Sequence, residues 1–158
     1  MPLSATPSTP SLLLAIGTGF AGITTGLTLS WPVIWYGPLE KSSNSETVRL
    51  LHGSYKNATR CIPPMLLATT AFFCASKYSS HKTLVSLPAL FAFINIPWTF
   101  LAVFPVNAQL FRKEADPVSV VDKDNSVNAL LKKWMYVHSA RILFAASATV
   151  LGLAELLH

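Results

Sequence analysis

The segment SLLLAIGTGFAGITTGLTLSWPVIWYG, residues 11–37, decides the fold class. No charged side chain interrupts it, and an α-helix of this length is long enough to cross the roughly 30 Å of hydrocarbon in a bilayer. Trp31, Trp35 and Tyr36 end it with the aromatic residues typical of a membrane interface. Pro32 is expected to disturb the last turns. The residues before the segment lack the basic region of a secretory signal, so we expect a retained first span.

Three further apolar segments follow, at residues 61–78, 83–106 and 129–157. Proline is tolerated in the first turn of a helix, where we expect Pro63 and Pro64 to lie in the second span. Pro88 and Pro97 are expected inside the third span and should bend it. The fourth helix is expected to begin near Ser126, ahead of its apolar part.

The first long loop carries its own helix signal. Residues 43–46, SNSE, have the pattern of a capping box, which predicts the start of a short amphipathic helix. Val48, Leu51 and Tyr55 would share its apolar face. The chain is therefore predicted to be all-α, a single four-transmembrane-helix bundle with a short amphipathic helix in the first loop.

Composition agrees with a membrane protein. The chain has 158 residues, of which 12% are charged and 51% hydrophobic, whereas about a quarter of a typical soluble domain is charged. The net charge of +5 is spread out, without a run of five Lys or Arg. We therefore expect membrane lipid around the chain and no nucleic-acid partner.

Basic residues predict the orientation. Nine of the twelve Lys and Arg lie in or beside the two long loops, namely Lys41, Arg49, Lys56, Arg60, Arg112, Lys113, Lys123, Lys132 and Lys133. Only Lys77 and Lys82 fall on the other side. Because basic loops stay in the cytosol, both long loops are predicted to be cytosolic and both termini to lie on the opposite side of the membrane. The membrane is predicted to be that of the endoplasmic reticulum.

Small residues recur on one side of the first span, at Gly17, Gly19, Gly22 and Gly26. Small side chains let a neighbouring helix come close. The pattern predicts tight helix packing there, and it also allows a helix-packed homo-oligomer.

Trp134, His138 and Arg141 are spaced i, i+4 and i+7, so they share one face at the start of the fourth span. Asn107 follows the third span, and the intervening loop should bring it to a similar depth. Each residue considered by itself has a simpler interpretation: Trp134 as an interfacial anchor, His138 as a packed side chain and Asn107 as a helix terminator. Arg141 differs, because a charge facing lipid at that depth costs about 3 kcal/mol, so it should face the bundle interior. Together the four residues form a candidate pocket.

The sequence lacks the residues that metal-dependent and cofactor-dependent enzymes require. A carboxylate-bridged metal pair needs several Glu and His on facing helices, but Glu155 is the only acidic residue within a span. No Walker loop, HExxH or GxSxG motif occurs. If the chain is an enzyme, we expect no metal and no bound cofactor, which leaves acid–base and electrostatic catalysis.

The motifs FPVNAQL, residues 104–110, and WMYVHSARILFA, residues 134–145, resemble the DUF1772 or anthrone oxygenase family. These are small four-helix membrane proteins common in fungal polyketide gene clusters. The resemblance covers nearly the whole chain. It implies a cofactor-free, monooxygenase-type enzyme that uses O₂ to convert an anthrone, a fused aromatic polyketide, to an anthraquinone through a base-generated carbanion.

The resemblance also implies roles for particular residues. His138 is the natural base, because its reference pKa is near 6.5. Arg141 and Asn107 would hold the oxyanion and the phenolic oxygens. Trp134 and Trp98 would stack on the flat substrate. Tyr136 and His52 are lesser candidates for substrate binding.

Two other functions compete with this one. The same acid–base groups would suit a membrane isomerase or cyclase acting on a lipophilic polyketide or terpenoid intermediate. A bundle that only scaffolds a biosynthetic complex, or binds a lipophile, would need no catalytic group at all.

The predicted orientation has a direct test. Asn57-Ala58-Thr59 is a sequon for N-glycosylation. If the first loop is cytosolic, the native protein carries no glycan there. A glycosidase-sensitive mass shift that disappears in Asn57→Gln would mean that the orientation is inverted.

Overall fold

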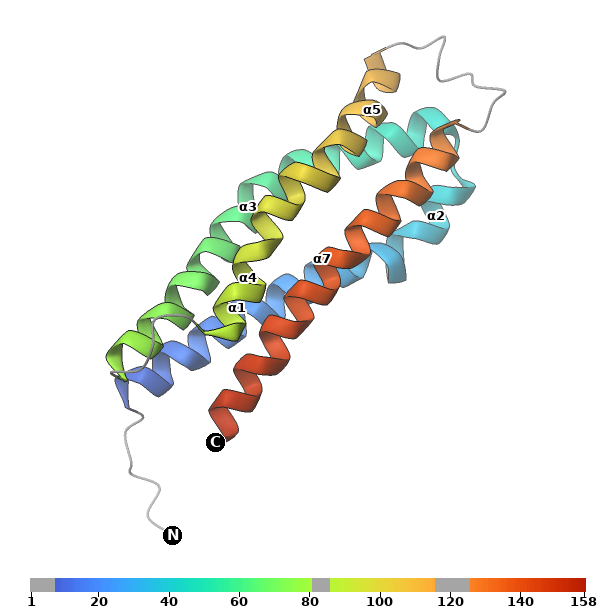
Figure 1. Ribbon diagram of the computed structural model, residues 1–158. Coiled ribbons are helices and arrows are strands. Elements are labelled where there is room, and N and C mark those ends of the chain that lie inside the picture. The colour runs from blue at the N-terminus through green and yellow to red at the C-terminus, as the bar shows by residue number, and fades with distance from the viewer. Residues whose placement is uncertain (1–7, 81–85, 116–125) are drawn as a thin grey trace.

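The computed structural model describes residues 8–80, 86–115 and 126–158, and it arranges them as four long helical runs in one bundle (Figure 1). The first run is α1 (Thr9–Ser30), the π-helical turn η1 (Trp31–Trp35) and α2 (Tyr36–Lys41). The second is α3 (Asn44–Ser79). The third is α4 (Leu87–Trp98), the π-helical turn η2 (Thr99–Val103) and α5 (Phe104–Ala115), and the fourth is α7 (Ser126–Leu157).

All four runs are long and apolar enough to cross a membrane. Successive runs alternate in direction, so the start of α1 and the end of α7 lie at the same end of the bundle (Figure 1). At that end, two contacts join α3 to its neighbours α1 and α7. Ser76 Oγ donates to the Pro10 carbonyl at 2.8 Å, and Lys77 Nζ lies 2.8 Å from Glu155 Oε2. The predicted all-α bundle of four membrane spans is confirmed.

The predicted separate amphipathic helix is wrong. Ser43 does cap a helix, because its Oγ accepts from the Glu46 backbone N–H at 3.4 Å, but this helix continues as α3 to Ser79 without interruption. Pro63 and Pro64 consequently lie in the middle of a helix rather than in a first turn. They deprive the carbonyls of Thr59 and Arg60 of their usual donors. Both of those residues are exposed.

The third run also differs from the prediction. Pro88 lies in the first turn of α4, not inside the span, while residues 83–85 lie outside the described residues. Pro97 is inside the helix, as predicted, and the π-helical turn η2 follows it at Thr99. The helix does not stop at residue 106. It continues as α5, so Asn107 is an interior helical residue and not a terminator.

The distribution of side chains between the surface and the interior of the bundle is that of a membrane protein. Large apolar residues such as Leu101 and Leu143 are exposed, at 78% and 67%, where lipid would cover them. Polar residues are buried instead. Several threonines satisfy their hydroxyls within their own helix, as Thr18 does with the Leu14 carbonyl at 2.8 Å. The bundle interior therefore holds more than apolar packing.

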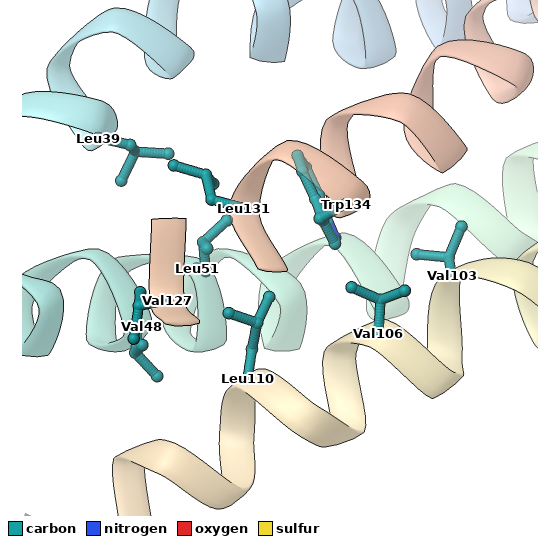
Figure 2. Close-up of a cluster of buried hydrophobic side chains, with 9 residues drawn as sticks. All are labelled: Leu39, Val48, Leu51, Val103, Val106, Leu110, Val127, Leu131 and Trp134. Carbon is teal, nitrogen blue, oxygen red and sulfur yellow. The ribbon is translucent and has the colours of Figure 1, made fainter. Parts of the chain in front are cut away.

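Two apolar clusters lie toward opposite ends of the bundle. The cluster at the α2–α3 end comprises Leu39, Val48, Leu51, Val103, Val106, Leu110, Val127, Leu131 and Trp134 (Figure 2). The other cluster is built from smaller residues around Phe73, namely Leu14, Ala21, Phe73, Ala89, Ala92 and Ala148. The first cluster is thus built mainly from larger side chains, whereas alanines make up most of the second.

The predicted glycine stripe packs only in part. A Cβ on Gly17 would lie 3.1 Å from the Phe73 ring, but nothing comes within 4 Å of one on Gly19 or Gly26. The closest packing involves Gly152, on α7, where a Cβ would lie 2.5 Å from Thr18 Oγ1 and 3.1 Å from Phe73. Gly17 and Gly152 thus hold the Phe73 ring between α1 and α7. The homo-oligomer remains a prediction.

Gly152→Ala should therefore lower the thermal unfolding midpoint of the detergent-solubilised protein. Inserting a methyl group into this contact should cost about 1–3 kcal/mol, the usual effect of overpacking a core. Gly19→Ala is the matched control, since its added methyl group meets no neighbour. An unchanged midpoint in Gly152→Ala would contradict the close contact between α1, α3 and α7.

Candidate active site

One face of α7 carries a buried tryptophan, histidine and arginine. Trp134, His138 and Arg141 are 7%, 2% and 8% exposed, and they continue the buried line of Leu131 and Ala145. No proline interrupts α7, so the i, i+4, i+7 spacing holds and the three side chains share one face. A membrane-spanning helix thereby directs a histidine and an arginine into the interior of the bundle.

Aromatic rings hold the imidazole of His138. The Trp134 ring stacks on it, with 4.6 Å between centroids and 15° between planes. Trp31 meets both rings edge-on, at 5.2 Å from Trp134 and 6.4 Å from His138. Trp134 is itself fixed, because its Nε1 donates to Asn107 Oδ1 at 2.8 Å. The indole N–H is only a donor, so the amide of Asn107 must present its oxygen to Trp134.

A proline explains the hydrogen bond that orients His138. Thr28 is four residues before Pro32, and proline has no N–H to donate to the Thr28 carbonyl. That carbonyl accepts from the Trp31 N–H and lies 3.0 Å from His138 Nε2. A carbonyl only accepts, so Nε2 must carry the proton. In the neutral imidazole Nδ1 then holds the lone pair, and no group in the described part of the chain forms a hydrogen bond with Nδ1.

Arg141 lies one turn further along α7, close enough for its charge to act on His138. Its Nε is fully buried without a hydrogen-bond partner. No ion pair or hydrogen bond joins its guanidinium to a residue within 8–80, 86–115 or 126–158. A fixed positive charge inside the bundle is thus available to an anion.

These groups line a cavity of about 90 Å³, several times the roughly 10–15 Å³ that a single water needs on the same measure. α3 contributes an apolar wall that includes Leu51, Tyr55 and Ile62. The third run contributes Thr99, Phe100, Val103, Phe104 and Asn107, and the remaining side includes Trp31, Trp134, His138 and Arg141. The walls are mostly apolar and aromatic, with a few polar groups, which is the usual make-up of a small-molecule site.

Four of the seven predicted site residues meet at this cavity: Asn107, Trp134, His138 and Arg141. The other three do not line it. Trp98 braces α4 against α7, with its Nε1 donating to the Val137 carbonyl at 2.9 Å. Tyr136 is 81% exposed, because two residues turn a helix by about 200° away from Trp134. His52 stacks on Phe111 at 4.3 Å.

Sequence reasoning missed two kinds of residue. Trp31 was assigned to the membrane interface, but it packs edge-on against Trp134 and His138. Asn95 was not singled out, although it is an amide within an apolar span and is only 1% exposed. A polar side chain in a membrane span is itself a signal of function, so the sequence alone offered a reason to single out Asn95. Nothing local distinguished Trp31 from Trp35.

Residues 51–151 match the family described as anthrone oxygenase. The chain belongs to the anthrone oxygenase family. A curated relative, anthrone oxygenase tpcL of Aspergillus fumigatus, is 33% identical over 100 residues, covering 60% of this chain and 61% of the relative. The match thus spans about three fifths of the relative's length. No solved structure matches the chain.

In this anthrone oxygenase family member, the bond from Trp134 to Asn107 can be tested by a double-mutant cycle. Asn107→Leu leaves the buried indole N–H without an acceptor, which should cost about 1–3 kcal/mol. Trp134→Phe removes the donor, so adding Asn107→Leu to it should cost less. We expect a coupling of about 1 kcal/mol from unfolding in detergent. Additive effects would show that the bond contributes nothing to stability.

Proposed function

We propose that this chain is an oxygenase that uses O₂ to convert an anthrone-type fused aromatic polyketide to an anthraquinone, without a metal or bound cofactor. The observation that carries the proposal is the orientation of His138. Its Nε2 is committed to the Thr28 carbonyl, and its Nδ1, without a hydrogen-bond partner, is left to act as the base beside Arg141.

Proton removal is the step that the protein must catalyse. An anthrone has an acidic methylene across the middle ring from its carbonyl. Nδ1 takes one methylene proton, and the negative charge spreads to the carbonyl oxygen. The guanidinium of Arg141 stabilises that oxygen, and such stabilisation is large where water is excluded. A base and a cation one helical turn apart suit a substrate whose acidic carbon and oxygen lie at opposite sides of one ring.

The rest of the reaction follows from the carbanion. The anion transfers one electron to O₂, and the resulting radical and superoxide combine at the methylene carbon. The peroxide takes the proton back from the imidazolium. Loss of the remaining C–H proton and cleavage of the O–O bond then release water and leave a carbonyl. One oxygen atom of O₂ enters the quinone and the other becomes water, so no external reductant is required.

The aromatic wall supports a flat substrate. Trp31, Tyr55, Phe100 and Phe104 line the cavity together with Trp134, and they are assigned here to substrate contact in place of Trp98, Tyr136 and His52. Asn107 holds Trp134 through its oxygen, which makes Asn107 a positioning residue for the ring that stacks on His138.

We also propose the endoplasmic reticulum as the membrane, with both long loops in the cytosol. The support is the charge distribution. Lys41, Arg49, Lys132 and Lys133 lie toward the α2–α3 end of the bundle, whereas Lys77 lies at the opposite end in an ion pair with Glu155 (Figure 1). Basic residues favour the cytosolic side.

Labelled oxygen tests the activity. The purified protein is given a dihydroxyanthrone and ¹⁸O₂ in the presence of EDTA, and the quinone is analysed by mass spectrometry. One labelled oxygen per quinone, formed faster than without protein, is the expected result. Product without label would indicate an isomerase or cyclase, and activity lost to EDTA and restored by iron would end the cofactor-free mechanism.

The site assignment predicts graded losses. His138→Ala should lower turnover by about 10² to 10⁴, the usual contribution of a general base, with a smaller change in substrate affinity. Arg141→Ala should also impair turnover, and Arg141→Lys less so, because Lys keeps the charge but loses the planar fork of donors. Lys133→Ala, which is exposed, is the control. Wild-type rates in both alanine variants at the site would refute the assignment.

A further inference from the structure

Three buried side-chain atoms lack a hydrogen-bond partner in the described part of the chain: Asn95 Nδ2, His138 Nδ1 and Arg141 Nε. Such atoms are few in native proteins and call for an explanation at each position. Two of the three belong to the site already described. The third belongs to Asn95, which the proposed mechanism has not used.

Asn95 is an expensive residue at its position. It lies in α4 within an apolar membrane-spanning run, and it is 1% exposed. An unpaired amide N–H in such a place costs about 1–3 kcal/mol. A leucine of similar size would avoid that cost. The backbone carbonyl of Asn95 accepts from Thr99 Oγ1 at 2.7 Å, but this bond needs no amide side chain.

The packing of α4 on α7 places Asn95 at the depth of Arg141. The two helices run in opposite directions (Figure 1), and Trp98 Nε1 donates to the Val137 carbonyl at 2.9 Å. Asn95 is three residues before Trp98, and Arg141 is four residues after Val137. Because the helices are antiparallel, Asn95 and Arg141 lie on the same side of this contact, each about one helical turn from it.

Asn95 also adjoins the cavity. Its neighbour Ile96 and the residue one turn later, Thr99, both line it. Thr99 shares a helix face with Asn95, because residues four apart stack on an α-helix. Asn95 does not itself line the cavity, but its amide lies beside this part of the wall, on the helix face that carries Thr99.

The chemistry of the three atoms is complementary. Asn95 Nδ2 and Arg141 Nε can only donate, whereas His138 Nδ1 is the lone-pair nitrogen. A ligand that satisfies all three must offer an acceptor to the two donors and a proton to the imidazole. Asn107 also lines the cavity, and because its oxygen accepts from Trp134, its Nδ2 is the group that remains to donate.

We propose that Asn95 is a further catalytic residue, whose Nδ2 binds, together with Arg141, the substrate oxygen that becomes negative when His138 removes the proton. The inference rests on the proposed function and deepens it. It restricts the substrate to molecules with an acidic C–H conjugated to an oxygen on the opposite side of the ring. It also adds Asn95 to the donors around the oxyanion.

Two variants of Asn95 test the proposal. Asn95→Leu removes the donor and fits the apolar span. Asn95→Asp keeps the size but replaces the donor with a negative charge. Both should lower kcat on a dihydroxyanthrone by about 10² to 10³, as loss of one oxyanion donor does elsewhere, with little change in KM. Phe93→Leu, on the exposed side of α4, is the control.

Stability separates catalysis from structure. If Asn95 binds substrate, Asn95→Leu keeps or raises the unfolding midpoint while turnover is lost. A purely structural role would lower the midpoint and leave turnover per folded molecule unchanged, which would overturn the proposal. Wild-type kcat in both Asn95 variants would overturn it as well, and would leave the oxygenase function standing.

A dihydroxyanthraquinone probe keeps the test independent of turnover. Binding at two donors should favour its phenolate, seen as a red-shifted visible band that weakens in Asn95→Leu. An equal band in wild type and Asn95→Leu would count against the proposal. If the wild type turns over no anthrone but the band still depends on Asn95, the oxygenase function fails and the oxyanion site stands.

Discussion

The structure depends on where a backbone carbonyl finds its donor inside a membrane. In hydrocarbon each backbone polar group must be satisfied within the protein, so a proline in a span creates a demand that another element must meet. Pro32 leaves the Thr28 carbonyl without its usual donor, and His138 Nε2 lies 3.0 Å from it. One contact therefore ties the first helix to the fourth, places the imidazole and selects its tautomer.

The prolines also account for the shape of the cavity. Pro32 lies in η1, and Pro97 is followed within two residues by η2. A π-helical turn widens the helix locally and shifts the side chains that follow, and such turns are frequent at functional sites. η1 supplies Trp31 to the site, and η2 supplies Thr99, Phe100 and Val103 to the cavity wall. The uninterrupted α7 opposite them keeps Trp134, His138 and Arg141 on one face.

Much of the fold and part of the candidate site could be predicted from the periodicity of the sequence. Hydropathy predicts the four spans, SNSE predicts the cap at Ser43, and the spacing of Trp134, His138 and Arg141 predicts their common face. The same periodicity turns Tyr136, a lesser candidate, away from that face. Periodicity does not predict which neighbour a face meets. Trp31 could not be assigned to the site, because its position depends on a π-helical turn and on the packing of α1 against α7. The continuity of α3 was missed because a paired proline usually marks a helix start, not an interior.

Arg141 shows how a membrane site can favour the reaction over binding. A charge at the centre of a span costs about 3 kcal/mol on insertion scales, and the described residues offer it no counter-ion. In the proposed reaction, a neutral anthrone gives it none either. Once a proton moves to His138, the substrate oxygen becomes an anion next to a guanidinium in a medium of low dielectric constant. The attraction thus arises only as the proton is transferred. Interactions confined to the transition state raise kcat rather than affinity, so the unpaired arginine makes a strained resting state and a stabilised reacting one.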